Sequence, residues 1–166
     1  MAPTWFLTLC GLSIIGCAVV AGVLLTFSDF VMRSLNGAKP GAGIEVMQVI
    51  NREVFKTVFM TLSGGLLLAT PVLMGYAYVN LAGPAVVLII AGGAIFISGV
   101  FAVTLAFNVP MNNRLAGLDA SAADAAAYWA VTYFPNWTFW NWVRSIASAA
   151  SAACYLLAWV WLAQAR

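Results

Sequence analysis

Four long apolar runs decide what this chain can fold into. They cover residues 5–27, 57–79, 85–107 and 139–163. The first three hold no charged residue, and the fourth holds only Arg144. A helix needs roughly 20 apolar residues to cross about 30 Å of hydrocarbon, so each run can span a bilayer. With 64% apolar residues and a mean hydropathy of +0.98, we expect an integral membrane protein whose main partner is the lipid bilayer.

The spacing of the runs predicts a single domain over residues 1–166. The link at 80–84, Asn-Leu-Ala-Gly-Pro, is short enough to make the second and third runs an antiparallel hairpin. Glycine pairs at 64–65 and 92–93 predict close helix contacts, because small residues let backbones approach. The predicted fold class is an all-α membrane protein, a four-transmembrane-helix bundle with short interfacial amphipathic helices in the first and third connections.

The first run has one competing interpretation, a secretory signal. An Ile-Ile-Gly-Cys sequence ending at Cys17 resembles a lipoprotein cleavage box. No basic residue precedes the run, and its apolar core is longer than that of a signal peptide, so a membrane span is the preferred interpretation. The three cysteines, Cys10, Cys17 and Cys154, all lie inside spans and are expected to be small buried hydrophobes without disulfides.

Basic residues lie almost entirely on one side of the predicted spans. The opposite side, where both chain ends lie, has only Arg166. By the positive-inside rule, we expect both long connections to face the cytoplasm and both termini to lie outside, in a bacterial inner membrane. The basic residues in or beside the long connections are Arg33, Lys39, Arg52, Lys56, Arg114 and Arg144.

Both long connections are expected to contain a short helix. In the first, a Gly/Pro turn over 37–43 precedes apolar residues at helical spacing from Ile44 to Val54, as in an interfacial amphipathic helix. In the second, residues 121–124 have the pattern of a capping box that opens an alanine-rich helix. Pro110 is expected to break the third span, and Pro135 to end the alanine-rich helix.

Four polar clusters lie at the same side of the spans, at residues 27–33, 47–51, 108–114 and 137–144. Asp29 and Arg33 are four residues apart and can pair on one helix face, either to neutralise each other or as part of a site. Asn108 and Asn112 either satisfy backbone groups freed by Pro110 or contact a ligand.

The last cluster begins a polar stripe along the fourth span, which predicts that Asn141 and Arg144 point into the bundle. Polar groups at that depth are costly unless they are paired or used. Asp29 or Glu53, on the same side, is a candidate partner that would make Arg144 purely structural. The stripe consists of Asn141, Arg144, Ser145, Ser148, Ser151 and Tyr155.

The absence of histidine excludes several classes of site. His-ligated haem, the facial iron triad and most copper or zinc centres cannot be built from this chain alone. No Ser/His/Asp or Cys/His system is possible, and no phosphate-binding glycine loop is present. The spacing of the five carboxylates does not predict a metal site. We therefore expect neither a metal nor a cofactor, and the small net charge of +2 gives no reason to expect nucleic acid.

Taken in order, the clusters resemble the anthrone oxygenase-like family of small four-helix membrane proteins, a domain of unknown function in most bacterial members. Some members are associated with oxidation of anthrones to anthraquinones by dioxygen without an evident cofactor. Relatives often have histidine after the Trp-Asn pair, where this chain has Trp142, so a His base is excluded. The motifs are Phe-Ser-Asp-Phe-Val-Met at 27–32, Met-Gln-x-x-Asn at 47–51, Val-Pro-x-Asn at 109–112 and Trp-x-x-Trp-Asn-x-x-Arg at 137–144.

The resemblance implies a polycyclic phenolic or quinone-like ligand between the cytoplasmic ends of the helices. Asp29 is the only carboxylate in a motif and would act as the base if burial made it more basic. Arg144, or Arg33, would stabilise the developing enolate. We thus expect Asp29 and Arg144 to be catalytic. The expected ligand-binding residues are Arg33, Gln48, Asn51, Asn108, Asn112, Trp137, Trp140 and Asn141.

Two other function classes stay open at this point. In the first, the chain is a non-catalytic accessory or assembly subunit, whose polar clusters hold helices together and whose surface docks membrane protein partners or further copies of itself. In the second, it is a small-molecule carrier. Transport usually requires polar groups near the bilayer midplane, and the second and third spans carry almost none, so the carrier is the weaker alternative.

Overall fold

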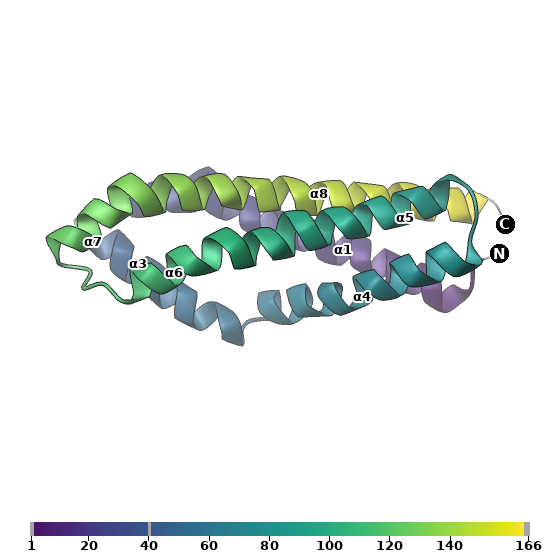
Figure 1. Ribbon diagram of the computed structural model, residues 1–166, viewed down its shortest axis with the longest axis horizontal. Coiled ribbons are helices and arrows are strands. Elements are labelled where there is room, and N and C mark those ends of the chain that lie inside the picture. Colours follow the sequence, from purple (N-terminus) through teal and green to yellow (C-terminus); the bar gives the residue numbers. More distant parts are fainter. Residues whose placement is uncertain (1, 40, 165–166) are drawn as a thin grey trace.

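The computed structural model describes residues 2–39 and 41–164, which are helical in all their ordered elements and contain no strand. Each apolar run falls on one long helix, so the predicted four-helix membrane bundle is confirmed. Both ends of the described chain lie at one end of the bundle, and the two long connections lie at the other (Figure 1). The four helices that can span a membrane are Thr4–Asn36, Val58–Asn80, Pro84–Ala116 and Ala123–Gln164.

Three of these helices contain short stretches of wider, π-helical turns. The remaining elements are α-helices and one short 3-10 helix before the second span. In chain order the elements are α1 (Thr4–Thr26), η1 (Phe27–Val31), α2 (Met32–Asn36), α3 (Ala42–Glu53), η2 (Val54–Lys56), α4 (Val58–Asn80), α5 (Pro84–Ile95), η3 (Phe96–Ala102), η4 (Thr104–Asn108), α6 (Val109–Ala116), α7 (Ala123–Tyr128), η5 (Trp129–Tyr133) and α8 (Phe134–Gln164).

The bundle is longer than a bilayer is thick. The four long helices have 33, 23, 33 and 42 residues. At 1.5 Å per residue, the 33-residue helices extend about 50 Å, against about 30 Å of hydrocarbon. Of the four continuous long helices, only Val58–Asn80 (α4) has membrane length, and α3 lies in the part of the bundle beyond its end (Figure 1). We call the part of the bundle that α4 runs along, at the end with the chain termini, the membrane half. We call the part at the other end, which contains α3 and the long connections, the connection half.

In the membrane half, α8 packs against α1 and α5, and α4 packs against both of these. The core is apolar, with Phe6, Ile89 and Phe96 fully or almost fully buried. A Cβ on Gly92 would lie 3.0 Å from the Cys154 Cβ, so the predicted close contact at 92–93 is confirmed. The matching prediction for 64–65 is wrong, because nothing lies within 4 Å of a Cβ built on either glycine.

The connection half has its own apolar core, built around Met32, Met47 and Leu115. The amphipathic helix of the first connection is confirmed as α3, and its apolar stripe packs on this core. α2 and α3 pack closely at Gly43, since a Cβ there would collide with the Leu35 carbonyl oxygen. The helix of the second long connection, α7, continues without a break into the last span.

Pro110 and Pro135 do not end their helices, so both predicted breaks are wrong. Each proline lies two residues after a π-helical turn, η4 or η5. Proline lacks an N–H, and its ring clashes with the carbonyl four residues earlier in an α-helix. In a π-helical turn the hydrogen bonds span five residues, which moves that carbonyl and relieves the clash. The helix therefore continues through each proline.

The turn before α7 differs from the predicted capping box. The N-cap of α7 is Ala122, and no side chain caps it. The N–H and the hydroxyl of Ser121 instead both donate to the carboxylate of Asp119, at 2.9 and 2.8 Å. These two hydrogen bonds lower the pKa of Asp119 below its ordinary value. The predicted capping box is therefore wrong, although the helix that it was expected to open exists.

Candidate functional site

A layer of buried polar side chains lies between the two apolar cores. It is formed where η1, η4 and α8 meet, and its members include Ser28, Asn108, Asn141 and Arg144, all less than 9% exposed. The polar stripe predicted along the last span is confirmed, because all of its residues from Asn141 to Tyr155 are buried. Burial of this many polar groups requires hydrogen-bond partners, which identify how the layer is organised.

Three π-helical turns carry the polar layer and its surroundings. Ser28 and Asp29 lie in η1, Thr104 and Asn108 in η4, and Tyr133 in η5. A π-helical turn inserts one extra residue into an α-helix and so changes the face on which the following side chains lie. Such turns are frequent at functional sites. Here they direct polar side chains from three helices into one layer.

Arg144 is a buried cation, 8% exposed. Its Nη2 donates to Asn141 Oδ1 at 2.5 Å and its Nη1 to Thr104 Oγ1 at 3.3 Å. The guanidinium carbon lies 5.4 Å from the centre of the Trp137 ring. Its Nε has no partner, and among residues 2–39 and 41–164 no carboxylate lies within 4 Å of the guanidinium. The charge is thus held by neutral groups and one ring face.

The predicted pairing of Arg144 with Asp29 or Glu53 is therefore wrong. Asp29 pairs with Arg33 at 3.0 Å, as their spacing predicted, and Glu53 pairs with Lys56 at 3.3 Å. Both pairs are exposed, so neither carboxylate reaches the buried layer. The Asp29 side chain is exposed, so the burial that was the condition for a more basic carboxylate is not observed.

Asn141 connects Arg144 to the first helix. It is fully buried and accepts the Arg144 hydrogen bond through its Oδ1. Its Nδ2 donates to the Leu24 carbonyl and to the Ser28 hydroxyl, both at 2.6 Å. A continuous chain of hydrogen bonds therefore runs from Arg144 through Asn141 to Ser28.

Asn112 is the centre of a second network, on the side of the connection half. Its Oδ1 accepts from the Tyr133 hydroxyl at 2.8 Å and from Trp137 Nε1 at 2.9 Å. Asn51 Nδ2 donates to the same Tyr133 hydroxyl at 3.3 Å. Asn108 Nδ2 donates to the Trp137 carbonyl at 3.3 Å, but its Oδ1 is buried and has no partner in the described chain. The structure thus brings Asn51, Asn108, Asn112 and Trp137 together.

Two other predicted ligand-binding residues lie outside these networks. Gln48 Nε2 donates to the carbonyls of Leu115 and Leu118 at 2.8 and 2.9 Å, so it caps the end of α6. Trp140 stacks on Phe107, with ring centres 3.6 Å apart and planes at 5°. This stack is only partly buried, and Trp140 makes no hydrogen bond to the polar layer within the described part of the chain.

A groove of about 330 Å³ runs between η1, α2 and α8. Because Asp29 and Arg33 lie on one wall, we call it the Asp29 groove. Its aromatic residues are Phe134 and Trp142. Small-molecule sites usually start at roughly 300 Å³, so the groove is large enough for a compact ligand. The residues that line it are Ser28, Asp29, Arg33, Phe134, Thr138 and Trp142.

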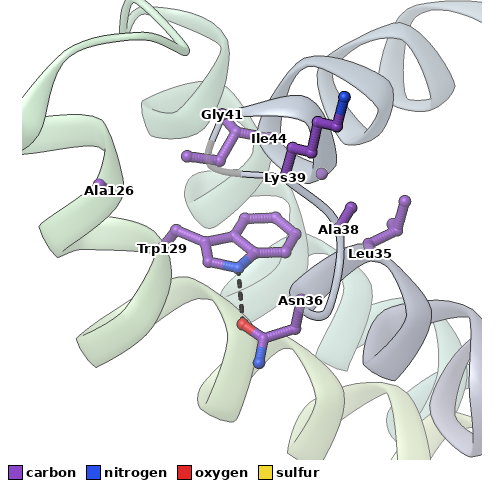
Figure 2. A pocket seen from close by; sticks show the side chains of 9 residues that line it. Leu35, Asn36, Ala38, Lys39, Gly41, Ile44, Ala126 and Trp129 are labelled. Carbon is purple, nitrogen blue, oxygen red and sulfur yellow. Dashed lines mark hydrogen bonds between the residues drawn. The ribbon is translucent and has the colours of Figure 1, made fainter.

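A second cavity lies at the tip of the connection half, between α2, α3 and η5. It is only about 110 Å³, below the usual range of small-molecule sites. Figure 2 shows Trp129 directed across it, with its Nε1 donating to Asn36 Oδ1 at 2.9 Å. The exposed Lys39 lies at its rim. This hydrogen bond joins η5 to the end of α2. We therefore regard the cavity as a gap in the packing of these elements and not as a ligand site.

Residues 2–39 and 41–164 contain no group of three or more His, Cys, Asp or Glu side chains arranged to hold a metal ion. Cys10 and Cys17 are buried in the membrane half, and both are free thiols. The chemically distinctive groups of the described chain are therefore the buried guanidinium, the amides around it and the ion pair of the Asp29 groove.

Several residues of the site were missed from the sequence. Tyr133 lies four residues before Trp137 on the same stripe, and it was overlooked because Pro135 was expected to end the helix between them. Thr104 lies four residues before Asn108, so the same helical spacing to a polar residue could have identified it. Ser28 and Thr138 lie inside the motifs, but nothing in the sequence shows that both line a groove.

Comparison with known proteins places the chain in a family. The family model described as Anthrone oxygenase matches residues 52–154, which is more than half of the chain. No curated protein matches the chain, and no solved structure does. The matched range includes the motifs around Asn112 and Asn141, whereas Asp29 and Gln48 lie before it. On this evidence the chain belongs to the anthrone oxygenase family.

Proposed function

We propose that the protein is a cofactor-free oxygenase that converts anthrones or similar polycyclic phenols to quinones in the Asp29 groove. One observation carries this proposal: a carboxylate, Asp29, lines the same groove as two aromatic side chains, Phe134 and Trp142. The aromatic residues offer faces for a flat ring system, and the carboxylate offers a proton acceptor. Family membership supplies the reaction class.

The reaction balances without any further reactant. Asp29 removes a proton from the CH₂ group that lies opposite the ketone in the anthrone, and the electron pair moves into the ring system as an enolate. The enolate gives one electron to dioxygen, and the resulting radical and superoxide combine into a peroxide at the same carbon. Loss of water turns that carbon into a carbonyl. One oxygen atom ends in the quinone and the other in water.

The charges around the groove favour the enolate. Asp29 and Arg33 neutralise each other, so the buried guanidinium of Arg144 leaves this end of the protein with a surplus positive charge. A fixed positive charge in a medium of low dielectric stabilises negative charge that develops nearby. In this proposal Arg33 contacts the ligand, and Arg144 acts from behind the groove wall through Asn141.

The amides of the second network support the groove in this scheme. Asn51 and Asn112 bond to Tyr133 and Trp137, and Trp137 directly precedes Thr138 of the groove wall. Gln48 fixes α6 at its end. Ligand contact by these residues, and by Asn108, Trp137 and Trp140, stays a prediction. Their protein partners favour a positioning role.

The second candidate function is a non-catalytic accessory or assembly subunit with membrane protein partners or further copies of the chain. The observation in its favour is the same set of amides, because Gln48, Asn51 and Asn112 all bond to protein groups. Locking helices together in lipid is a sufficient role for a polar layer of this kind. The carrier is not favoured, since the core of the membrane half is apolar.

The location that fits this proposal is a bacterial inner membrane with both long connections in the cytoplasm. Six of the seven basic residues lie in or beside those connections, which follows the positive-inside rule. The Asp29 groove would then open at the cytoplasmic edge of the bilayer. A flat apolar substrate concentrates in lipid and can reach such a groove laterally.

The proposal is tested with purified protein, an anthrone and dissolved dioxygen, with quinone formation followed by absorbance. We expect oxidation faster than in buffer, and a loss of about 100-fold or more in Asp29→Asn, since a general base contributes at least that much. Glu53→Gln removes another exposed, paired carboxylate and should leave the rate unchanged. A wild type no faster than buffer would favour the accessory subunit instead.

A further inference from the structure

We propose that the hydroxyl groups of Ser28 and Thr138 bind a ligand oxygen in the Asp29 groove, and that Arg144 strengthens the Ser28 donor through Asn141. The inference rests on the proposed function for the identity of the ligand, an aromatic ketone. It assigns a ligand-binding role to two residues that line the groove. It also gives the buried Arg144 a specific task as a positioning residue.

The first step is the unusual state of the Ser28 hydroxyl. Other buried or half-buried serine hydroxyls in the spans donate to a backbone carbonyl, as Ser13 does to Leu9 and Ser63 does to Phe59. Ser28 makes no such bond within the described chain. The carbonyl four residues before it, that of Leu24, accepts from Asn141 instead. Ser28 itself only accepts a hydrogen bond, from Asn141 Nδ2 at 2.6 Å, so its own hydrogen is available to a ligand.

The second step is that the Thr138 hydroxyl also donates to no protein group. Its Oγ1 is buried and has no hydrogen-bond partner among residues 2–39 and 41–164. Buried hydroxyls without partners are rare, because each costs the desolvation of a polar group. Thr138 and Ser28 come from different helices and line one groove. Neither hydroxyl hydrogen is therefore used by the protein, and both residues belong to the groove wall.

The third step is the connection of Ser28 to a permanent charge. Arg144 Nη2 donates to Asn141 Oδ1, and the amide of Asn141 donates in turn to Ser28 Oγ. Hydrogen bonds arranged in a chain polarise one another, and a charged donor at the start strengthens the effect. The Ser28 O–H becomes a stronger donor than an isolated serine. The positive charge of Arg144 thereby acts on the groove although the guanidinium is buried.

A purely structural role explains these bonds less well. The seam between α1 and α8 is already held by Ser145 and Ser148, which donate to the carbonyls of Ala21 and Cys17 at 3.1 and 2.8 Å. These serines donate their hydrogens to the backbone, as residues that only join helices do. Ser28 lies at the groove end of the same seam and does not.

The arrangement specifies the chemistry of the ligand. Asp29 is an acceptor only, whereas Ser28 and Thr138 provide donors in the same groove. A ring that carries an acidic CH₂ group and a conjugated ketone satisfies both, because removal of the CH₂ proton places negative charge on the ketone oxygen. Donors aimed at that oxygen stabilise the enolate more than the ketone, which is the requirement for catalysis.

The test uses binding of anthraquinone, which carries the ketone and needs no turnover. Its carbonyl stretching frequency is measured by infrared difference spectroscopy on the purified protein. We expect a lower frequency in the wild type than in Ser28→Ala or Thr138→Val, because a donated hydrogen bond weakens the C=O bond. Ser28→Thr, which keeps a hydroxyl, should retain the shift. Ser145→Ala is the matched control and should lower the melting temperature without changing the frequency.

Activity and coupling complete the test. Ser28→Ala should lower kcat with anthrone by about 100-fold while leaving the melting temperature unchanged. In an Arg144→Gln background, the frequency change caused by Ser28→Ala should shrink, since the charge behind the donor is gone. An equal frequency in wild type and both hydroxyl variants would overturn the inference, as would a Ser28→Ala protein that is merely unstable.

The outcomes separate this inference from the proposed function. Anthrone oxidation without a carbonyl shift would overturn the inference and leave the function standing. A shift without oxidation would retain Ser28 and Thr138 as a binding site and reject the oxygenase. Absence of both anthraquinone binding and oxidation would reject both proposals.

Discussion

At the scale of single residues, Arg144 is the most informative side chain in this protein. It is buried near the start of the last apolar run, and its partners in the described chain are neutral. A charge at such a depth costs several kcal/mol unless a carboxylate compensates it. Because burial of Arg144 lowers the stability of the protein, we expect the residue to have a function. We propose that this function is to stabilise an enolate.

This account predicts that Arg144→Met separates stability from activity. The apolar side chain removes an uncompensated charge, so we expect the melting temperature to stay the same or rise, while anthrone oxidation falls by about 100-fold. If Arg144 were a structural clamp, the change would leave the buried Asn141 Oδ1 without its donor and destabilise the protein by about 1–3 kcal/mol. Arg114→Met, at an exposed arginine that lies over the Tyr128 ring, is the control and should change neither quantity strongly.

Trp142 provides a second prediction at the residue scale. It lines the same groove as Asp29. We expect Trp142→His to add a base to the groove. The pH profile of anthrone oxidation should then gain a step at about pH 6.5, where histidine ordinarily loses its proton. Trp142→Phe keeps an aromatic wall without a base and should show no such step. Identical profiles for the two variants would place position 142 outside the reaction.

At the scale of elements, the π-helical turns account for most of what sequence reasoning missed. The spans follow from the length of the apolar runs, the antiparallel hairpin from its short link and α3 from apolar periodicity, and all three were predicted. The continuity of the helices through Pro110 and Pro135 was not, because the usual rule treats proline as a helix end. The extra residue that relieves each proline has no sequence signature of its own. Tyr133, which Pro135 was expected to separate from the stripe, was missed for the same reason.

A pair of glycines tests the packing of elements. A Cβ on Gly43 would collide with the Leu35 carbonyl, and neither helix can shift without breaking the contact of α2 with α3. We expect Gly43→Ala to destabilise the protein by about 2 kcal/mol or more. Gly64→Ala meets nothing within 4 Å and should stabilise α4 by about 0.5–1 kcal/mol. Thermal unfolding in detergent measures both, and equal effects would contradict the packing described for α2 and α3.

At the scale of the whole molecule, the bundle combines two helical arrangements end to end. α4 completes the membrane half and α3 completes the connection half, and the polar layer lies between their cores. Hydropathy could predict the first half. In the second half only α3 and α7 were predicted, since α2 and α6 are not apolar enough to stand out in the sequence. The candidate site was predicted in part: Asn141 and Arg144 from their stripe, but not the Asp29 groove, which depends on how η1 and α8 meet.

The orientation of this molecule can be tested with two engineered cysteines. Ala82→Cys lies in the exposed link between α4 and α5, and Ser121→Cys lies in the exposed connection before α7. In bacterial cells, with Cys154→Ala as background, a membrane-impermeant maleimide should label position 82 in intact cells and position 121 only after lysis. The reverse pattern would place the long connections outside.

The most direct test of the central claim is a labelling experiment with ¹⁸O₂. Purified protein, without added metal or cofactor, is given an anthrone, and the quinone and the oxygen uptake are measured together. The proposed reaction predicts one dioxygen consumed per quinone formed and one labelled oxygen atom in the new carbonyl, with Asp29→Asn reduced to the rate of buffer. A quinone without label, or the same labelled yield in Asp29→Asn, would contradict it.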